Sequence, residues 1–240
     1  MSEQQPLVVV AFGAPGTGKS TLCGELLARN GDAASPFRFA IIDEPTQRAD
    51  IVALLTQMYN ETADDIAAGR SVAALAQTSI MEARVESYID FANNRLPAER
   101  ARAASEHKRL VVVCDGHVLS DTEIYVRAKF EAGQISDAEL MTFIARRHEA
   151  LNGVSDAFAR PALYCHLTID DDPSGAKHHH RVCTQRNNAV ESGVDSSVFA
   201  RLAQYASEAS TTLRCADRLP TNELSPTAVC DQFIARCATK

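Results

Sequence analysis

A glycine-rich octapeptide near the N-terminus constrains this chain more than any other feature. Residues 13–20 read Gly-Ala-Pro-Gly-Thr-Gly-Lys-Ser and fit G-x-x-x-x-G-K-[ST], the pattern of a phosphate-binding loop. The unbroken apolar run before it, residues 7–12, is typical of a strand buried on both faces of a parallel sheet. Leucines at 22, 26 and 27 follow at helical spacing. Because strand, glycine turn and helix occur in the order that the motif requires, the sequence predicts a site for a nucleoside triphosphate.

The residue types of the loop suit phosphate chemistry. Glycines let backbone N–H groups turn inward toward phosphate oxygens, and the helix N-terminus adds a partial positive charge. We expect Lys19 to reach the outer phosphates and the Ser20 hydroxyl to bind Mg²⁺. The predicted ATP-binding residues are Gly13, Ala14, Pro15, Gly16, Thr17, Gly18, Lys19, Ser20 and Thr21.

The rest of the chain alternates strand and helix patterns. Further strands are predicted at 37–42, 110–114, 162–169 and, more weakly, 213–216. Helices are predicted at 49–60, at 63–104 with a break near Leu96-Pro97, and at 121–132, 136–151, 176–187, 196–210 and 226–238. The alternation predicts an α/β fold of the P-loop kinase type, in which 1–240 form one domain around a five-stranded parallel sheet with helices on both faces. Since ligands bind beyond the carboxyl ends of such strands, we expect the chemistry at 13–20, 43–48, 115–121 and 181–191.

Charge and cysteine content narrow the partners and the compartment. The 24 Lys and Arg against 31 Asp and Glu give a net charge of −7, which argues against binding to a nucleic-acid polymer. The seven cysteines include no C-x-x-C pair, so we expect reduced thiols and a cytoplasmic, intracellular location. The apolar run after the polar N-terminus is too short for a membrane span.

Carboxylates follow two of the predicted strands. Glu44 stands at the end of the second strand, where a carboxylate can take the proton from an acceptor hydroxyl as it attacks a phosphoryl group. Asp43 competes for this role, and the sequence does not separate the two. Asp115 directly follows an apolar strand, the pattern that places a carboxylate near Mg²⁺. A solvated loop carboxylate at Glu44 and a structural aspartate at Asp115 are the alternatives.

Histidines near the expected site have simpler interpretations than metal binding. Consecutive helical residues point in three directions, so His178, His179 and His180 cannot hold one ion together. With Lys177 and Arg181 they predict a basic surface near the phosphates. His117 is expected to fill a turn rather than to bind phosphate.

Several motifs in order resemble the deoxynucleoside kinase family, which includes deoxycytidine, deoxyguanosine and mitochondrial-type thymidine kinases and viral relatives. The resemblance runs from Val8 to about Tyr205. Its parts are the loop 13–21, Asp43-Glu44-Pro45, Met58-Tyr59, Gln77, Asp115-Gly116-His117-Val118-Leu119-Ser120-Asp121, and the stretch 185–194. The resemblance implies transfer of the γ-phosphate of ATP to the 5′-hydroxyl of a deoxynucleoside, with ATP and Mg²⁺ as cofactors.

The resemblance also implies roles at the phosphate end of the site. Glu44 matches the base that activates the 5′-hydroxyl, and Lys19 acts on the phosphates. Arg186 matches the first arginine of a lid, here approximately 181–194, that stabilises the transferring group. Asp115 takes the place of the acid that begins the family's Asp/Glu-Arg-Ser motif and would share Mg²⁺ with Ser20.

At the substrate end, the resemblance matches Gln77 to the glutamine that pairs with the nucleobase, and Tyr59 and Glu191 to the pair that holds the 3′-hydroxyl. Arg84 lies seven residues after Gln77, about two helical turns, so both can face one pocket. Arg84 and Asp121 resemble the charged pair of the deoxycytidine and deoxyguanosine branch. We therefore expect deoxycytidine first, then a purine, with thymidine less favoured; an ordinary salt bridge is the alternative.

The chain departs from the family pattern at several positions. Gly116 stands where the family has arginine, Asn188 replaces the second lid arginine, Ala49 replaces an aromatic residue, and the segment between Tyr59 and Gln77 is longer. Candidates for the missing positive charge are His117, Arg48 and the Lys177–Arg181 cluster. These departures predict a slower or looser enzyme, since one misplaced phosphate-clamping group reduces the rate by on the order of 10²-fold.

Two other functions stay open at this stage. A nucleoside monophosphate kinase or another small-molecule P-loop kinase would need a cluster of arginines for the acceptor phosphate, and none is clear. A nucleotide-binding regulatory protein without transfer activity is favoured by Gly116 and Asn188 and disfavoured by the set Glu44, Gln77 and Glu191. The family's usual homodimer is expected through the helices at 63–104 and 120–151.

Overall fold

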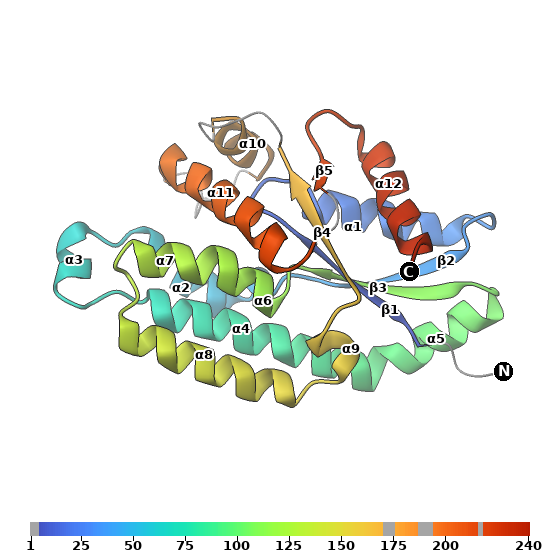
Figure 1. Cartoon of the computed structure of the whole chain (residues 1–240), viewed down its shortest axis with the longest axis horizontal. Coiled ribbons are helices and arrows are strands. Elements are labelled where there is room, and N and C mark those ends of the chain that lie inside the picture. Colours follow the sequence, from blue (N-terminus) through green and yellow to red (C-terminus); the bar gives the residue numbers. More distant parts are fainter. Residues whose placement is uncertain (1–4, 170–175, 187–193, 216–217) are drawn as a thin grey trace.

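Five parallel strands form the centre of the molecule in the order β2-β3-β1-β4-β5 (Figure 1). The computed structural model describes residues 5–169, 176–186, 194–215 and 218–240. The strands are β1 (Leu7–Phe12), β2 (Phe37–Ile42), β3 (Arg109–Asp115), β4 (Leu163–Thr168) and β5 (Arg218–Pro220). This confirms the predicted five-stranded parallel sheet.

The continuous apolar runs of the strands supply two separate cores, one on each face of the sheet. In β1, Val8, Val10 and Phe12 belong to one core. The alternate residues Leu7, Val9 and Ala11 belong to the other. This two-residue period means that both faces of the central strand are covered, as a parallel sheet requires.

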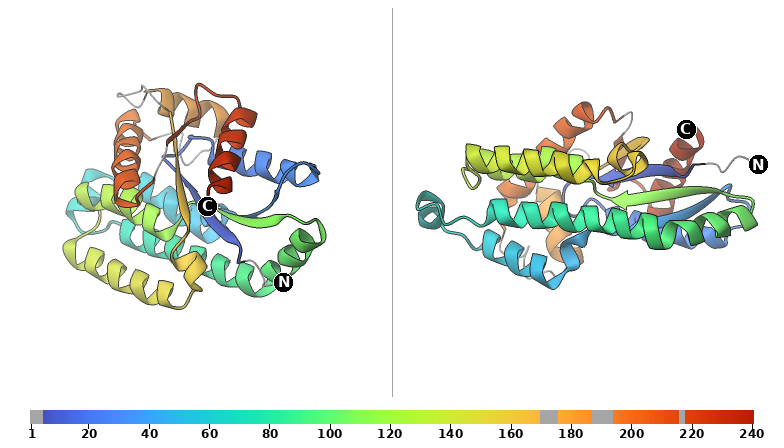
Figure 2. Two further views of the ribbon diagram at one scale, coloured as in Figure 1. Left: turned by 45° about the vertical axis from the view of Figure 1, so that its right-hand side comes forward. Right: turned by 90° about the horizontal axis from the view of Figure 1, so that it is seen from below.

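Helices cover the two faces unequally. The face of Leu7 and Val9 is covered by α1 (Lys19–Ala28) and α12 (Pro226–Ala238). Most other helices lie on the opposite face (Figures 1 and 2). They are α2 (Ala49–Tyr59), α4 (Ala73–Asp90), α5 (Leu96–Ser105), α6 (Val118–Asp121), α7 (Arg127–Glu131), α8 (Asp137–Asn152), α9 (Asp156–Ala159) and α11 (Ser196–Thr212). The other α-helices of the described residues are α3 (Ala63–Ala67) and α10 (Ala176–Arg186).

The long helical segment predicted at 63–104 is interrupted elsewhere than expected. The break falls between α3 and α4, whereas the chain passes through Leu96-Pro97 as a helix. A π-helical turn, Phe91–Arg95, precedes the proline. A proline ring lacks the N–H and clashes with the carbonyl four residues earlier, and the wider turn accommodates it. Figure 2 (right) shows α4 and α5 as one long rod.

The fifth strand was predicted wrongly at 213–216. Helix α11 continues to Thr212, and the Cys215 N–H donates to Ser210 O at 2.8 Å in the turn that ends it. The strand β5 forms at Arg218–Pro220, next to β4. Three residues are too few to show an alternating pattern, so the pairing with Thr168 and its neighbours selects them.

Strand order and register bring the expected site residues to one edge. In the parallel register Ala11 lies opposite Asp115, and Phe12 lies opposite His166. The loop after β1 is therefore flanked by the ends of β3 and β4. Among the described residues, no helix is long and apolar enough to cross a membrane. No disulfide joins the six cysteines whose side chains are described.

Candidate active site

The phosphate-loop lysine lies inside the loop that precedes it. Gly18 caps α1 in a left-handed conformation, with φ of 88°, which favours glycine. Lys19 begins the helix and is buried. Its Nζ donates to Gly13 O at 3.1 Å and to Ala14 O at 3.4 Å. A buried ammonium group at the N-terminus of a helix is suited to binding phosphate oxygens.

Helix α10 packs directly against this loop. A Cβ placed on Gly16, whose φ is +80°, would lie 2.6 Å from Val182 Cγ2. A Cβ on Gly18 would lie 3.2 Å from Arg181 Nη2. Arg181 Nη1 also donates to Thr221 Oγ1 at 3.1 Å. Arg181, a member of the predicted basic cluster, therefore lies beside the loop.

Ser20 and Asp115 meet as expected for a cation site. The Ser20 hydroxyl donates to Asp115 Oδ2 at 3.3 Å. Asp115 Oδ1 is buried and has no hydrogen-bond partner among the described residues. Burial, reinforced by the nearby Glu44 carboxylate, raises the pKa of Asp115 above its usual value. A hydroxyl and an unsatisfied carboxylate oxygen fit Mg²⁺, which prefers a few protein oxygens together with substrate phosphates.

The structure distinguishes the two carboxylates that follow β2. Asp43 is exposed, whereas Glu44 is partly buried and points toward α4. Glu44 Oε1 lies 3.8 Å from Arg84 Nη2. Glu44 is thus the carboxylate that belongs to the cluster at the edge of the sheet.

The predicted pair Arg84 and Asp121 forms and is buried. Arg84 on α4 has 1% of its surface exposed, and its Nε donates to Asp121 Oδ2 at 2.9 Å. Its Nη1 donates to Asp115 O at 2.6 Å, so the guanidinium joins α4, α6 and the end of β3. Burial, although opposed by Arg84, raises the pKa of Asp121 to about 6.

Arg84 also occupies the space beside Gly116. A Cβ on Gly116 would come within 2.9 Å of Arg84 Nη2. Two of the candidates named for the missing charge lie elsewhere. Arg48 is half-exposed and pairs with Asp50 and Glu86, and Arg181 reaches Gly18 rather than Gly116.

His117 fills a turn, as predicted. Its Nδ1 accepts the Leu119 N–H at 3.2 Å at the start of α6. Its Nε2 lies 2.8 Å from Phe158 O. The imidazole is fully buried, and burial lowers its pKa to about 4, so the ring is neutral and supplies no positive charge.

The remaining predicted substrate residues are only partly defined. Gln77 is buried on α4, two turns before Arg84. Tyr59 at the end of α2 is half-buried, and Lys129 Nζ lies 4.8 Å from its ring centroid. Glu191 and Asn188, the Arg186 side chain, residues 187–193 of the predicted lid and the Asp170–Asp172 run lie outside the described part of the chain.

Two residues of the helical segment 118–131 were missed by sequence reasoning. The Tyr125 hydroxyl donates to Gly13 O at 3.4 Å, which brings this segment to the phosphate loop. Lys129 covers Tyr59, and burial lowers its pKa to about 8. They follow Asp121 at four and eight residues, a spacing that could have found them.

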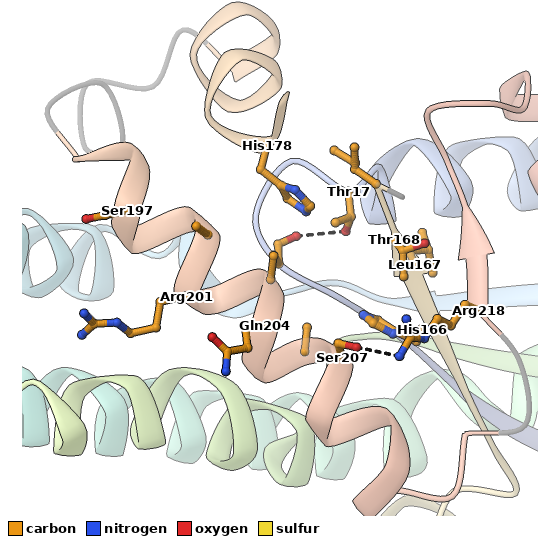
Figure 3. Close-up of a pocket in the computed structure, with 15 residues that line it drawn as sticks. Thr17, His166, Leu167, Thr168, His178, Ser197, Arg201, Gln204, Ser207 and Arg218 are labelled. Atoms are coloured by element: carbon orange, nitrogen blue, oxygen red, sulfur yellow. Dashed lines mark hydrogen bonds between the residues drawn. The ribbon is translucent and has the colours of Figure 1, made fainter. Parts of the chain in front are cut away.

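A cavity of about 780 Å³ borders the phosphate loop on the side of β4 (Figure 3). Its walls are β4, α10 and α11, and Thr17 and His178 lie where it meets the loop. His166 and Arg218 line the opposite end, where Arg218 Nη2 donates to Ser207 Oγ at 2.6 Å. Glu44, Arg84 and Asp121 are not among its lining residues, so the cavity is separate from the carboxylate cluster.

The three histidines of α10 point apart, as their spacing predicts. His178 is buried beside the loop, and the His179 ring lies 5.5 Å from that of Phe199. His180 is exposed. No group of three or more potential metal-ligating residues occurs among the described residues.

Comparison with known proteins identifies the architecture. No family model and no curated protein matches the sequence. A solved structure of deoxyadenosine kinase from M. mycoides with bound dATP matches with a TM-score of 0.66 and 14% identity, over 98% of this chain and 100% of that one. This chain shares the fold of deoxynucleoside kinases. A second structure of the same enzyme, with the products dCMP and a flexible dCDP, matches with a TM-score of 0.67 and 15% identity, over 97% and 99%. The P-loop kinase fold expected from the sequence is thus confirmed.

Proposed function

We propose that this protein is an ATP-dependent deoxynucleoside kinase that transfers the γ-phosphoryl group to the 5′-hydroxyl of a deoxynucleoside. One observation carries the proposal. Glu44 lies beside the buried Arg84, and Arg84 also contacts the main chain of Asp115, next to the phosphate loop. A carboxylate would thereby lie near the end of a triphosphate bound in the loop, where an acceptor hydroxyl must enter.

The residues present can carry the transfer by position and charge. Lys19 and the backbone N–H groups of the loop would hold the phosphates, and Arg181 would add a positive charge at Gly18. Ser20 and Asp115 would hold Mg²⁺, which neutralises phosphate charge when bound. Glu44 takes the hydroxyl proton while the 5′-oxygen forms a bond to the γ-phosphorus. The bond from that phosphorus to the β-phosphate oxygen breaks, and ADP leaves.

The acceptor is best described as deoxycytidine or a purine deoxynucleoside. Gln77 on α4 offers a side-chain amide, and Asp121 on α6 offers a carboxylate. Such groups favour an edge with an exocyclic amine and disfavour the methyl group of thymine. The M. mycoides enzyme of the same fold is described with dATP and with dCMP, which supports both bases.

Thermal unfolding with single ligands tests this assignment. Deoxycytidine alone, at 100 times its dissociation constant, should stabilise the protein by roughly 2.7 kcal/mol. ATP should stabilise it independently, and Lys19→Met should remove only the ATP effect. Stabilisation by dCMP without any response to a deoxynucleoside would favour a nucleoside monophosphate kinase. Stabilisation by ATP alone would favour a regulatory protein.

A further inference from the structure

One nitrogen of the buried Arg84 side chain faces Glu44 without a hydrogen bond. The bonds of Nε to Asp121 Oδ2 and of Nη1 to Asp115 O fix the guanidinium plane. Nη2 has no hydrogen-bond partner among the described residues and lies 3.8 Å from Glu44 Oε1. Because the guanidinium is a rigid fork, two bonds set the direction of the third nitrogen before a substrate arrives.

Glu44 has the freedom that Arg84 lacks. The Glu44 side chain is 23% exposed and follows the end of β2, whereas that of Arg84 is 1% exposed. A movement of about 1 Å would bring the carboxylate to hydrogen-bonding distance of Nη2. A buried donor without a partner is destabilising, so pairing with Glu44 is favoured. One carboxylate oxygen would then be fixed by Arg84, and the other would be available to a hydroxyl.

Gly116 provides the space for this arrangement. Its φ is +80°, and a Cβ there would lie 2.9 Å from Arg84 Nη2 and 3.2 Å from both Cζ and Nη1. The Gly116 N–H donates to Ala11 O at 2.8 Å, which fixes the turn to β1. Because the turn is fixed, a larger residue at 116 would displace the guanidinium from its position beside Glu44. Glycine at position 116 thus leaves the space that the Arg84 guanidinium occupies.

We propose that Arg84 is a positioning residue for Glu44 and that Gly116 is required for it. The inference rests on the proposed function. In the transfer step Arg84 gains and loses no bond to the reacting atoms; it orients the carboxylate that takes the 5′-hydroxyl proton. This role differs from reading the nucleobase, which is the role that the Arg84–Asp121 pair alone would suggest.

A double-mutant cycle separates the two roles. Arg84→Met should reduce kcat for deoxycytidine by about 10²-fold, because the Glu44 carboxylate would lose its alignment with the 5′-hydroxyl. In the Glu44→Gln background the same change should cause no further loss of kcat, since Arg84 acts through Glu44. Equal losses in both backgrounds, with a raised KM or an altered order of preference among the four deoxynucleosides, would overturn the inference. Absence of transfer by the wild type would overturn the proposed function, and this inference with it.

Gly116→Ala tests the same role without removing a buried charge, in case Arg84→Met fails to fold. The variant should lose kcat while ATP still raises its melting temperature and the KM for deoxycytidine changes little. The matched control for Arg84→Met is Arg48→Met. Arg48 is half-exposed and pairs with Asp50 and Glu86, so its loss should leave kcat unchanged. Wild-type kcat in folded Gly116→Ala would contradict the inference.

Discussion

At the residue scale, burial keeps His166 neutral. The ring is 2% exposed and stacks on Phe12 with 4.9 Å between centroids. Burial, and then the charges of Arg218 and His178, lower its pKa to about 3. The unfolded chain binds a proton near pH 6.5 and the folded protein does not, so stability must fall as the pH drops from about 6.5 toward 3.

We predict that His166→Phe reduces this loss of stability at acid pH. Phenylalanine keeps the stacking on Phe12 and cannot be protonated. The slope of unfolding free energy against pH should decrease by up to about 1.4 kcal/mol per pH unit below pH 6. Urea unfolding at a series of pH values measures it, with His148→Phe on the exposed face of α8 as the control. Parallel curves for wild type and His166→Phe would refute the prediction.

Arg181 provides a second residue-scale prediction, for the phosphate donor. Its Nη2 group lies beside Gly18, so Arg181→Gln should raise the KM for ATP by about 10-fold, as loss of one charge-assisted hydrogen bond does. The KM for the deoxynucleoside should stay the same. Arg146→Gln on α8, 58% exposed, is the matched control. An unchanged KM for ATP would mean that α10 does not contact the donor.

Local patterns predicted some of these residues and could not have predicted others. The loop 13–20 carries its own glycine spacing, and Asp115 follows an obvious buried strand, so both were predicted from the chain alone. The contact of Arg84 with Gly116 joins a helix to a turn 32 positions away. Only the packing of α4 against the sheet creates it, and no local spacing encodes it.

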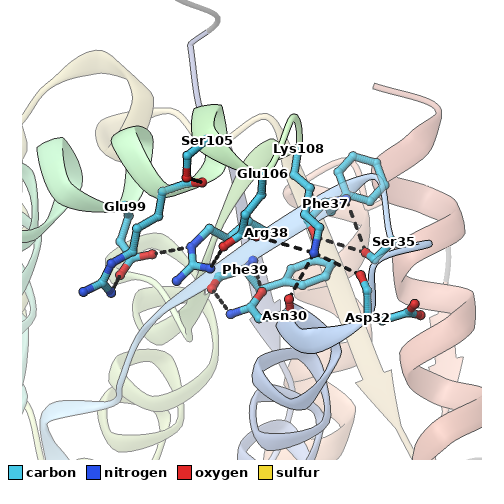
Figure 4. Close-up of polar contacts among 11 residues, drawn as sticks. Asn30, Asp32, Ser35, Phe37, Arg38, Phe39, Glu99, Ser105, Glu106 and Lys108 are labelled. Atoms are coloured by element: carbon cyan, nitrogen blue, oxygen red, sulfur yellow. Dashed lines mark hydrogen bonds and ion pairs between the residues drawn. The ribbon is translucent and has the colours of Figure 1, made fainter.

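At the element scale, the edge strand β2 depends on a side chain outside the sheet. Asn30 Nδ2 donates to Phe39 O at 2.9 Å, and the Phe39 N–H donates to Asn30 Oδ1 at 2.7 Å (Figure 4). Lys108 Nζ holds the Asn30 carbonyl at 3.0 Å. The amide thus replaces a neighbouring strand and satisfies the backbone of a residue that is 1% exposed.

Asn30→Ala should therefore destabilise the fold by about 2 kcal/mol, because it leaves two buried backbone groups unpaired. Chemical denaturation measures the difference. Asn30→Asp, which keeps the acceptor and loses the donor, should fall between wild type and alanine. A loss no larger than that of a surface substitution, within about 0.5 kcal/mol, would show that water replaces the amide.

Strands were predictable from the sequence where one or both of their faces carry apolar side chains over several residues. The runs at β1, β2, β3 and β4 are of this kind. The three-residue β5 is not, and Leu213, in the stretch predicted instead, is the C-terminal cap of α11.

At the scale of the whole molecule, we propose that α4 and α8 form the surface of the expected homodimer. Leu75 and Ile89 on α4 and Met141 on α8 are 57%, 40% and 65% exposed. The two helices pack side by side (Figure 1). A homodimer interface would cover these exposed apolar side chains. We predict a homodimer, and Met141→Lys should shift the sedimentation coefficient to that of a monomer. A wild-type mass of 26.0 kDa in solution would contradict this.

The most direct test of the central claim is phosphate transfer from ATP to each of the four deoxynucleosides, by the wild type and by Glu44→Gln. We predict transfer to deoxycytidine or a purine deoxynucleoside ahead of thymidine. Loss of the Glu44 carboxylate should reduce the rate of transfer by about 10² to 10⁴-fold in the variant, with ATP binding retained. Equal rates for wild type and variant would remove Glu44 from the mechanism. No transfer to any deoxynucleoside, with ATP still bound, would contradict the claim that this chain is a deoxynucleoside kinase.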